Sequence, residues 1–184
     1  MTIGIKDNIN YKLPLRVTSF EKEEIINFAK ANYLNEDLFS PNGHGRQFCM
    51  VLEKDVSIKN LVLNIRDRFM TELGITEWQE EPMFGIFIGV NTEGGAVHEH
   101  TDTAPNTHFH LRLNVMLQKP VSGGNPIMNQ KEISIEEDET WINIADYWKH
   151  ASTPVIGNKE RIVMSIGSFV PKTNEYLKSF FTVS

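Results

Sequence analysis

The hydrophobic period of the chain changes from helical to strand-like near residue 80, and this change most restricts the folds open to it. Residues 18–34 begin with Thr18 and Glu21 at capping-box spacing and then carry apolar residues at helical intervals. Residues 55–73 repeat this helical spacing, and Gly74 follows at a position that commonly ends a helix. The sequence therefore predicts two helices before residue 80.

After Pro82 the apolar residues come in short runs separated by residues typical of turns. The expected strands are 83–90, 97–102, 108–117, 132–135, 140–144 and 161–170. Two helices followed by short strands predict an α+β fold, mainly β, with a double-stranded β-helix (jelly-roll) core braced by N-terminal helices. We expect one domain over residues 1–184, with helical support over 1–80 and the jelly-roll core over 81–172.

Charge and cysteine content argue against several classes of protein. The net charge is -6 and no stretch is rich in Lys and Arg, whereas nucleic-acid binding needs clustered positive charge. No apolar run approaches about 20 residues and no signal-peptide pattern is present, so we expect no membrane association and a cytoplasmic location. The single cysteine, Cys49, cannot form an intramolecular disulfide. The sequence does not indicate the oligomeric state.

Three residues with metal-binding side chains have a spacing that suits an iron site. His100 and Asp102 are two residues apart, which on a strand places them on one face together with His98, and His150 follows later. Two histidines and one carboxylate form the facial triad that binds non-haem Fe(II) and leaves coordination positions open. A polar edge strand would explain a lone His-x-Asp more simply, but it does not explain the whole set.

Polar residues on two of the expected strands point to a cleft beside this site. Arg161 begins an otherwise apolar strand, where an unpaired guanidinium would cost several kcal/mol unless an anionic ligand binds it. Such a side chain could clamp a dicarboxylate through two parallel hydrogen bonds. Alternation along the third strand places His108, His110, Arg112 and Asn114 on one face, which either lines a polar cleft or faces water.

The three candidate ligands and the arginine resemble, in order and spacing, the Fe(II)/2-oxoglutarate-dependent dioxygenases. The resemblance covers roughly residues 83–170 and includes Gly123-Gly124, in a turn where many members carry this pair. The most similar branches are the aspartyl/asparaginyl β-hydroxylases and the proline hydroxylase-like enzymes. This chain has Asn114 where their strand carries a histidine, and it has Asp102 where the β-hydroxylases lack a carboxylate.

The resemblance implies a set of metal ligands and a set of residues for the cosubstrate 2-oxoglutarate. The residues that would bind Fe(II) are His100, Asp102 and His150. The residues that would bind 2-oxoglutarate are Arg161, at its distal carboxylate, with Asn114 and Arg112. The reaction would consume O2 and 2-oxoglutarate, release succinate and CO2, and hydroxylate an unactivated C–H bond of an amino acid, a peptide side chain or another small molecule.

Two other interpretations remain open from the sequence. A cupin-type metal enzyme would share the jelly-roll and would use His98-x-His100, but the glutamate expected a few residues later is missing. A non-catalytic jelly-roll binding module needs neither the complete triad nor Arg161. The loop over residues 40–46 could cover the site, and Arg46 in it either pairs with a substrate carboxylate or is a solvated loop charge.

Overall fold

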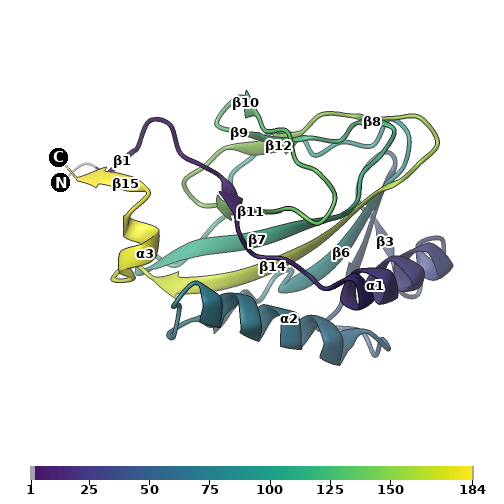
Figure 1. Ribbon diagram of the computed structural model, residues 1–184, viewed down its shortest axis with the longest axis horizontal. Coiled ribbons are helices and arrows are strands. Elements are labelled where there is room, and N and C mark those ends of the chain that lie inside the picture. The colour runs from purple at the N-terminus through teal and green to yellow at the C-terminus, as the bar shows by residue number, and fades with distance from the viewer. Residues whose placement is uncertain (1–2, 184) are drawn as a thin grey trace.

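The computed structural model describes residues 3–183 and has two main layers of strands with helices on one outer side. In Figure 1 the lower layer is a large twisted sheet covered from below by α1 and α2, and the upper layer contains β8, β9, β10 and β12. The two ends of the described chain meet at one side, where β1 and β15 pair.

Both expected helices form close to their predicted limits. The first, α1, spans Ser19–Asn32, and the backbone N–H of Glu21 donates to Thr18 Oγ1 at 3.2 Å while Glu21 Oε2 accepts from the backbone N–H of Thr18 at 2.7 Å. The second, α2, spans Lys59–Glu72, and Gly74 follows it with a φ of +66°. A left-handed residue at this place lets the chain leave the helix. The capping box and the terminal glycine thus act as the sequence predicted.

The large sheet has the strand order β2-β11-β7-β14-β6-β4-β3, with β5 paired to β14, and its pairings are antiparallel. The bounds are β2 Lys12–Leu13, β3 Ser40–Pro41, β4 Arg46–Met50, β5 Gln79–Glu80, β6 Ile86–Asn91, β7 His108–Gln118, β11 Thr140–Ile144 and β14 Arg161–Pro171. The first 80 residues therefore supply strands to this sheet as well as two helices.

Smaller sheets and one short helix complete the described structure. Their bounds are β1 Ile3–Ile5, β8 Ser122–Gly123, β9 Pro126–Met128, β10 Lys131–Glu132, β12 His150–Ser152, β13 Val155–Ile156, α3 Glu175–Lys178 and β15 Phe181–Val183. The strand β9 lies between β10 and β12, and β8 pairs with β13. Among residues 3–183, no helix is both long enough and apolar enough to cross a membrane.

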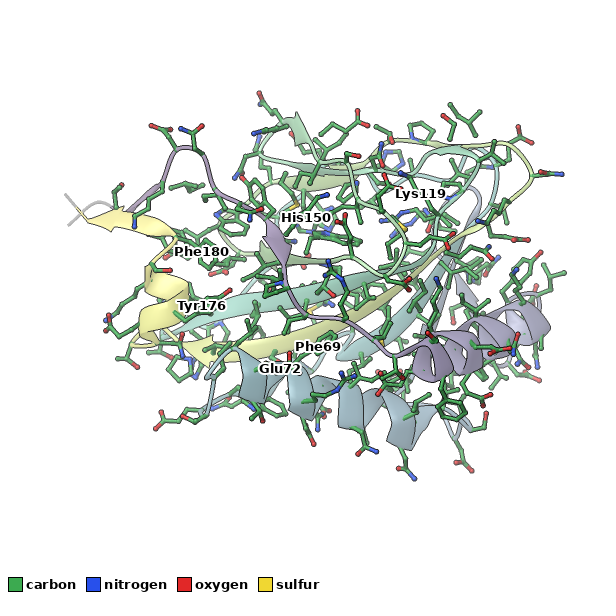
Figure 2. All side chains as sticks on the ribbon, viewed as in Figure 1. Phe69, Glu72, Lys119, His150, Tyr176 and Phe180 are labelled. Atoms are coloured by element: carbon green, nitrogen blue, oxygen red, sulfur yellow. The ribbon has the colours of Figure 1, made fainter. Side chains whose placement is uncertain are left out.

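The strands β7 and β14 lie in the middle of the large sheet and are buried on both faces. Toward the helices, Leu113 pairs with Ile166 and both are at most 1% exposed. Phe69 of α2 lies between that helix and the sheet and is fully buried (Figure 2). The opposite face of the same strands carries Asn114 paired with Ser165. The sheet therefore separates an apolar core from a polar interior.

The strand expected over residues 97–102 does not form, and this prediction was wrong. The segment makes only an isolated bridge with β12, between His100 and His150. Beside this bridge the pairing loses its register, because Val97 precedes His100 by three positions but Ser152 follows His150 by only two. The Ser152 N–H donates to the Val97 carbonyl at 3.0 Å, while the Val97 N–H donates to the Ser152 hydroxyl at 2.9 Å instead of a backbone carbonyl. The strand β4 was not expected at all, because its sequence, Arg46–Met50, shows no alternation of apolar and polar residues.

Candidate metal centre

The three candidate metal ligands come together at the edge of the upper layer. The backbone N–H of His100 donates to the His150 carbonyl at 3.1 Å, and that of His150 donates to the His100 carbonyl at 2.9 Å. Asp102 is held in place by its own N–H, which donates to the carbonyl of Ala145 at 2.8 Å. One ligand atom from each of the three side chains lies within 4.8 Å of the others. Figure 2 shows His150 between the upper and lower layers.

Both imidazole rings are oriented so that Nε2 is free to bind a metal. Nδ1 of His100 lies 2.8 Å from the His98 carbonyl, and Nδ1 of His150 lies 3.0 Å from the Trp148 carbonyl. A carbonyl oxygen only accepts, so each Nδ1 carries a proton and each Nε2 is directed away from the backbone. The Nε2 of His150 then presents its lone pair, whereas the Nε2 of His100 shares a proton with Asp102. The Nε2 atoms face the Asp102 carboxylate at 3.4 Å and 3.9 Å. Such backbone partners are those that orient histidine ligands in metal sites.

The protonation states of the three ligands suit a cation. Burial lowers the pKa of His150 to about 4, so this ring is neutral at pH 7. Burial by itself would raise the pKa of Asp102, but the hydrogen bond with His100 and the charge of Arg112 hold it below its usual range. The same hydrogen bond raises the pKa of His100. A divalent cation between these atoms would replace that shared proton.

A buried ion-pair network lies behind Asp102. Arg112 Nε donates to Asp102 Oδ2 at 3.3 Å, and Arg112 Nη2 donates to Glu81 Oε2 at 2.8 Å. Glu81 Oε2 also accepts from the backbone N–H groups of Phe84 and Gly85. The side chains of Arg112 and Glu81 are 6% and 1% exposed, so the charges of both are removed from water and depend on each other.

Glu81 has no signal in the sequence that marks it as a residue of the site. It stands in Glu80-Glu81-Pro82, a stretch that reads as an ordinary charged loop before the first core strand. Only its contact with Arg112 shows that it is buried, and Arg112 lies 31 residues away along the chain. A local pattern contains no information on such a partner.

A cavity of about 350 Å³ extends from the three ligands over the polar face of the large sheet. Besides the ligands, its walls contain polar, aromatic and small residues from both layers: Asn42, Arg46, Phe48, Phe84, Phe87, Gly89, Asn91, Val97, His98, Arg112, Asn114, Met128, Trp141, Asn143, Ala151, Arg161, Val163 and Ser165. Asp102 is the only carboxylate among the residues that line it. The cavity therefore combines three side chains that could hold a metal ion with an interior rich in hydrogen-bond donors.

Arg161 lies in this cavity as a buried cation without a counter-ion. Its Nε donates to the carbonyl of Gly124 at 2.7 Å, and its guanidinium carbon lies 5.9 Å from the ring centroid of Trp141. Among residues 3–183, no carboxylate lies within 4.0 Å of its nitrogens. Burial lowers its pKa to about 10, which leaves it charged at pH 7. The cavity therefore contains a buried positive charge that no carboxylate of the described residues neutralises.

The Gly-Gly turn singled out in the sequence has a structural role beside Arg161. Gly124 has a φ of +67°, and a Cβ there would lie 2.8 Å from Arg161 Cδ. A larger residue would therefore push the arginine stem out of its position.

The other predicted site residues lie nearby in different environments. Asn114 lines the cavity and is 9% exposed, so its strand face does not look onto water. Arg112 lines the cavity too, but its nitrogens are directed to Asp102, Glu81 and Ser165. His98 borders the cavity yet does not belong to the group of three ligand atoms.

Comparisons with known proteins agree with this fold. No protein-family model matches the sequence, and no curated protein sequence matches it significantly. Among solved structures, a viral collagen prolyl hydroxylase from Paramecium bursaria Chlorella virus-1, in complex with 2-oxoglutarate, is 14% identical with a TM-score of 0.62, covering 88% of this chain and 97% of that one.

Two further solved structures are similar over comparable lengths. A prolyl hydroxylase from Trichoplax adhaerens, in complex with a hypoxia-inducible factor peptide, is 11% identical with a TM-score of 0.66 and coverage of 90% and 85%. HygX from Streptomyces hygroscopicus, with nickel, 2-oxoglutarate and hygromycin B bound, is 11% identical with a TM-score of 0.60 and coverage of 88% and 82%. The chain thus has the jelly-roll fold of the 2-oxoglutarate oxygenases, and the predicted fold class is confirmed.

Proposed function

We propose that the chain is an Fe(II)- and 2-oxoglutarate-dependent dioxygenase that hydroxylates an unactivated C–H bond of an amino acid, a peptide side chain or another small molecule. One observation carries the proposal: two imidazole Nε2 atoms and a carboxylate converge at one end of a cavity that also holds an unpaired, buried guanidinium. The solved structures with this fold include hydroxylases and proteins with 2-oxoglutarate bound, which supports the proposal.

The donor set fits Fe(II). His100, Asp102 and His150 would bind the metal on one side and leave positions open toward the cavity. When bound, Fe(II) would supply the reaction of O2 with 2-oxoglutarate, which yields succinate and CO2 and oxidises a substrate C–H bond to an alcohol. The protein would contribute the positions of the reactants and a cavity from which water is excluded.

Arg161 would bind the distal carboxylate of 2-oxoglutarate. Its guanidinium is already fixed by Gly124 and Trp141, so little side-chain entropy is lost when the carboxylate arrives. Asn114 lines the same cavity, on the strand next to β14, and could donate to a cosubstrate oxygen. Binding of 2-oxoglutarate would also neutralise the buried charge of Arg161. The affinity for 2-oxoglutarate would therefore depend on how Arg161 is buried.

Arg112 is proposed to act mainly through Asp102. Its two carboxylate partners hold the guanidinium in place, and Arg112 in turn fixes the Asp102 oxygen at 3.3 Å. An outer partner of this kind keeps a ligand carboxylate in the geometry that the metal needs. A direct contact of Arg112 with 2-oxoglutarate remains a prediction.

A cupin or a non-catalytic module would leave Arg161 without a purpose. Either could use the jelly-roll, and a cupin could use the histidines, but neither explains a buried guanidinium without a carboxylate partner in the cavity of the three candidate ligands. We also propose that residues 1–184 act as one domain. A cytoplasmic location belongs to the same proposal, because a reducing compartment keeps iron ferrous and the only cysteine, Cys49, is free.

Anaerobic titration of the purified protein with Fe(II) and 2-oxoglutarate tests the proposal. We expect a visible charge-transfer band that appears only when both are present, is lost in His100→Ala and is weakened in Arg161→Ala. His98→Ala is the matched control, because His98 borders the cavity outside the ligand group and its carbonyl contact with His100 survives the substitution. Binding of Fe(II) without 2-oxoglutarate would favour the cupin alternative, and binding of neither would disprove the proposal.

A further inference from the structure

A row of three hydrogen-bond donors crosses the large sheet at one end of the cavity. Asn91 of β6 is the register partner of Arg161 in β14 on one side and of Arg46 in β4 on the other. Direct register partners present their side chains on the same face of a sheet, and neighbouring strands are about 4.8 Å apart. Two guanidinium groups with an amide between them thus share one wall of the cavity, and all three residues line it.

Arg46 and Asn91 have buried hydrogen-bond donors that no described residue accepts from. The Arg46 Nε is buried and has no hydrogen-bond partner among the described residues, and the amide nitrogen of Asn91, which is 2% exposed, has none either. The Arg46 guanidinium carbon lies 4.7 Å from the Phe48 ring centroid, which fixes its position. Burial lowers the pKa of Arg46 without any carboxylate to offset it.

Two other arginines, Arg66 and Arg68, each have carboxylate partners and can be compared with Arg46. Arg66 stacks on Trp78 in the same way, at 4.6 Å, but it also pairs with Asp67 and Glu80. Arg68 pairs with Glu21. Arg66 thus has both an aromatic neighbour and carboxylate partners, and Arg46 differs from Arg66 by the missing carboxylate.

With Fe(II) bound, the site would hold one positive charge more than its carboxylates and 2-oxoglutarate neutralise. Three arginines and Fe(II) supply five positive charges, and Asp102, Glu81 and 2-oxoglutarate supply four negative ones. The only carboxylate that lines the cavity, Asp102, already interacts with Arg112. In the proposed function, one carboxylate of 2-oxoglutarate faces the metal and the other faces Arg161. The charge of Arg46 acts on Arg161 as well, since it contributes to the lowered pKa of that residue. A second anion beside Arg46 would relieve this repulsion.

We propose that Arg46 and Asn91 bind an oxyanion of the substrate, a carboxylate or a phosphate, and that the substrate is a small molecule with an apolar body. This inference rests on the proposed dioxygenase function and narrows its substrate class. The apolar body would lie on the aromatic cluster Phe48–Phe84–Phe87, whose rings are 4.7 to 6.5 Å apart between centroids and which lines the cavity next to Arg46.

The size of the cavity agrees with a small substrate. Ligand pockets commonly measure about 300–1,000 Å³, and this one, at about 350 Å³, must also hold 2-oxoglutarate. The space that remains suits a compact molecule. A planar guanidinium matches carboxylate and phosphate through paired hydrogen bonds, and the Asn91 amide adds a further donor.

Calorimetric titration of the protein, loaded anaerobically with Fe(II) and 2-oxoglutarate, tests the subsite with three probes of similar shape. Phenylacetate and phenyl phosphate carry an oxyanion, and phenylacetamide is the neutral counterpart. We expect at least one anion to bind about 10-fold or more tightly than the amide, because charge-assisted hydrogen bonds account for about this difference. The tighter of the two anions identifies the substrate as a carboxylate or a phosphate.

Variants assign the preference to Arg46. In Arg46→Gln the affinities for the anion and the amide should differ by no more than about 3-fold. Arg46→Lys should keep only part of the preference for the anion, because lysine keeps the positive charge but lacks the paired donors. Arg66→Gln is the matched control, since it also removes a guanidinium stacked on an aromatic ring but lies outside the cavity lining. Thermal unfolding of each variant shows that it is folded.

Three results would overturn the subsite: equal affinities for anions and amide, an anion preference unchanged in Arg46→Gln, or a loss of 2-oxoglutarate affinity in Arg46→Gln as large as in Arg161→Gln. The last would make Arg46 part of the cosubstrate site. Failure of the proposed function is seen separately, as absence of 2-oxoglutarate binding to the wild-type protein. In that case the same three probes, titrated without 2-oxoglutarate, still decide whether Arg46 binds an anion.

Discussion

The two faces of the large sheet are both buried, yet they have opposite chemistry. Facing the helices, Leu113 and Ile166 belong to a continuous apolar core. Facing the cavity, the same two strands present Arg112 and Asn114 from β7 and Arg161 from β14, all less than 10% exposed. Burial of large apolar side chains stabilises the fold by about 1.5–3 kcal/mol each, whereas buried charges are stabilising only when well paired.

The helix face of the sheet therefore contributes mainly to stability, and the cavity face carries the residues that we propose for function. The helix face holds the strands together, so it can support a second face that is unfavourable for folding. On the cavity face, Arg112 is fully paired, while Arg161 and Arg46 are not paired with any carboxylate among residues 3–183. The unpaired groups are those that we propose for ligands, and the paired group is the one that we propose to orient Asp102.

The largest effect on stability is expected on the helix face. Phe69→Ala should lower the free energy of unfolding by about 3–5 kcal/mol, because the ring is fully buried in the core and its removal leaves a cavity. The folded fraction of Phe69→Ala should still bind Fe(II) and 2-oxoglutarate. Urea unfolding and anaerobic titration at low temperature measure the two properties.

Phe20→Ala is the control for this substitution. Phe20 lies on α1 and is 66% exposed, so the same change of residue should alter stability by no more than about 0.5 kcal/mol. A large loss of metal affinity in folded Phe69→Ala would show that the two faces are not separable.

A smaller effect on stability, joined to an effect on the site, is expected for Glu81→Gln. The substitution leaves Arg112 with one carboxylate partner in a buried place, which should cost about 3 kcal/mol. Asp102 would lose part of its support, so Fe(II) affinity should also fall, by about 10-fold. Urea unfolding and Fe(II) titration of the same preparation measure both.

Glu80→Gln removes the adjacent carboxylate, which is 54% exposed and only approaches Arg66 at 3.6 Å. We expect little change in either property. If Glu81→Gln loses stability but keeps full Fe(II) affinity, then Glu81 supports the fold alone and does not orient Asp102.

The smallest effect is expected at the surface, where charges face water. Burial would raise the pKa of Glu137, but Lys159, the backbone N–H of Lys119 and Lys22 lower it to about 2 from an ordinary value of 4.5. Because the folded-state pKa is below the unfolded one, Glu137 stabilises the protein above pH 4.5 and this contribution disappears as the pH falls toward 2. Solvent screening at this half-exposed site limits it to at most about 1 kcal/mol.

The comparison of wild type with Glu137→Gln measures this contribution. The difference in their free energies of unfolding should be greatest near neutral pH and should shrink as the pH falls from 4.5 to 2. Glu175→Gln is the control, since Glu175 is 86% exposed and pairs only with Lys178. A difference that grows at low pH would contradict the expected direction.

Sequence patterns predicted the regular elements well and the irregular ones poorly. The strand expected over residues 140–144 has the observed limits, and those over 108–117 and 161–170 are each one residue short. Alternation and helical spacing are local, so they can be recognised in a single chain. The segment over 97–102 has apolar and polar residues in the order of a strand, but its register against β12 is lost after one bridge, and the register depends on a segment about 50 residues away.

The types of residue at the site, and for Arg112 and Asn114 the strand face that they share, were already present in local patterns. His100, Asp102 and Arg161 stood out by spacing and by their apolar surroundings, because a strand or a turn imposes its periodicity on the few residues around it. Tertiary structure decided which charge has a partner. Glu81 reaches Arg112, while Arg46 and Arg161 meet across Asn91, only because strands far apart in the chain become neighbours in one sheet. Burial, and with it the free-energy cost of an unpaired charge, exists only once the layers have closed.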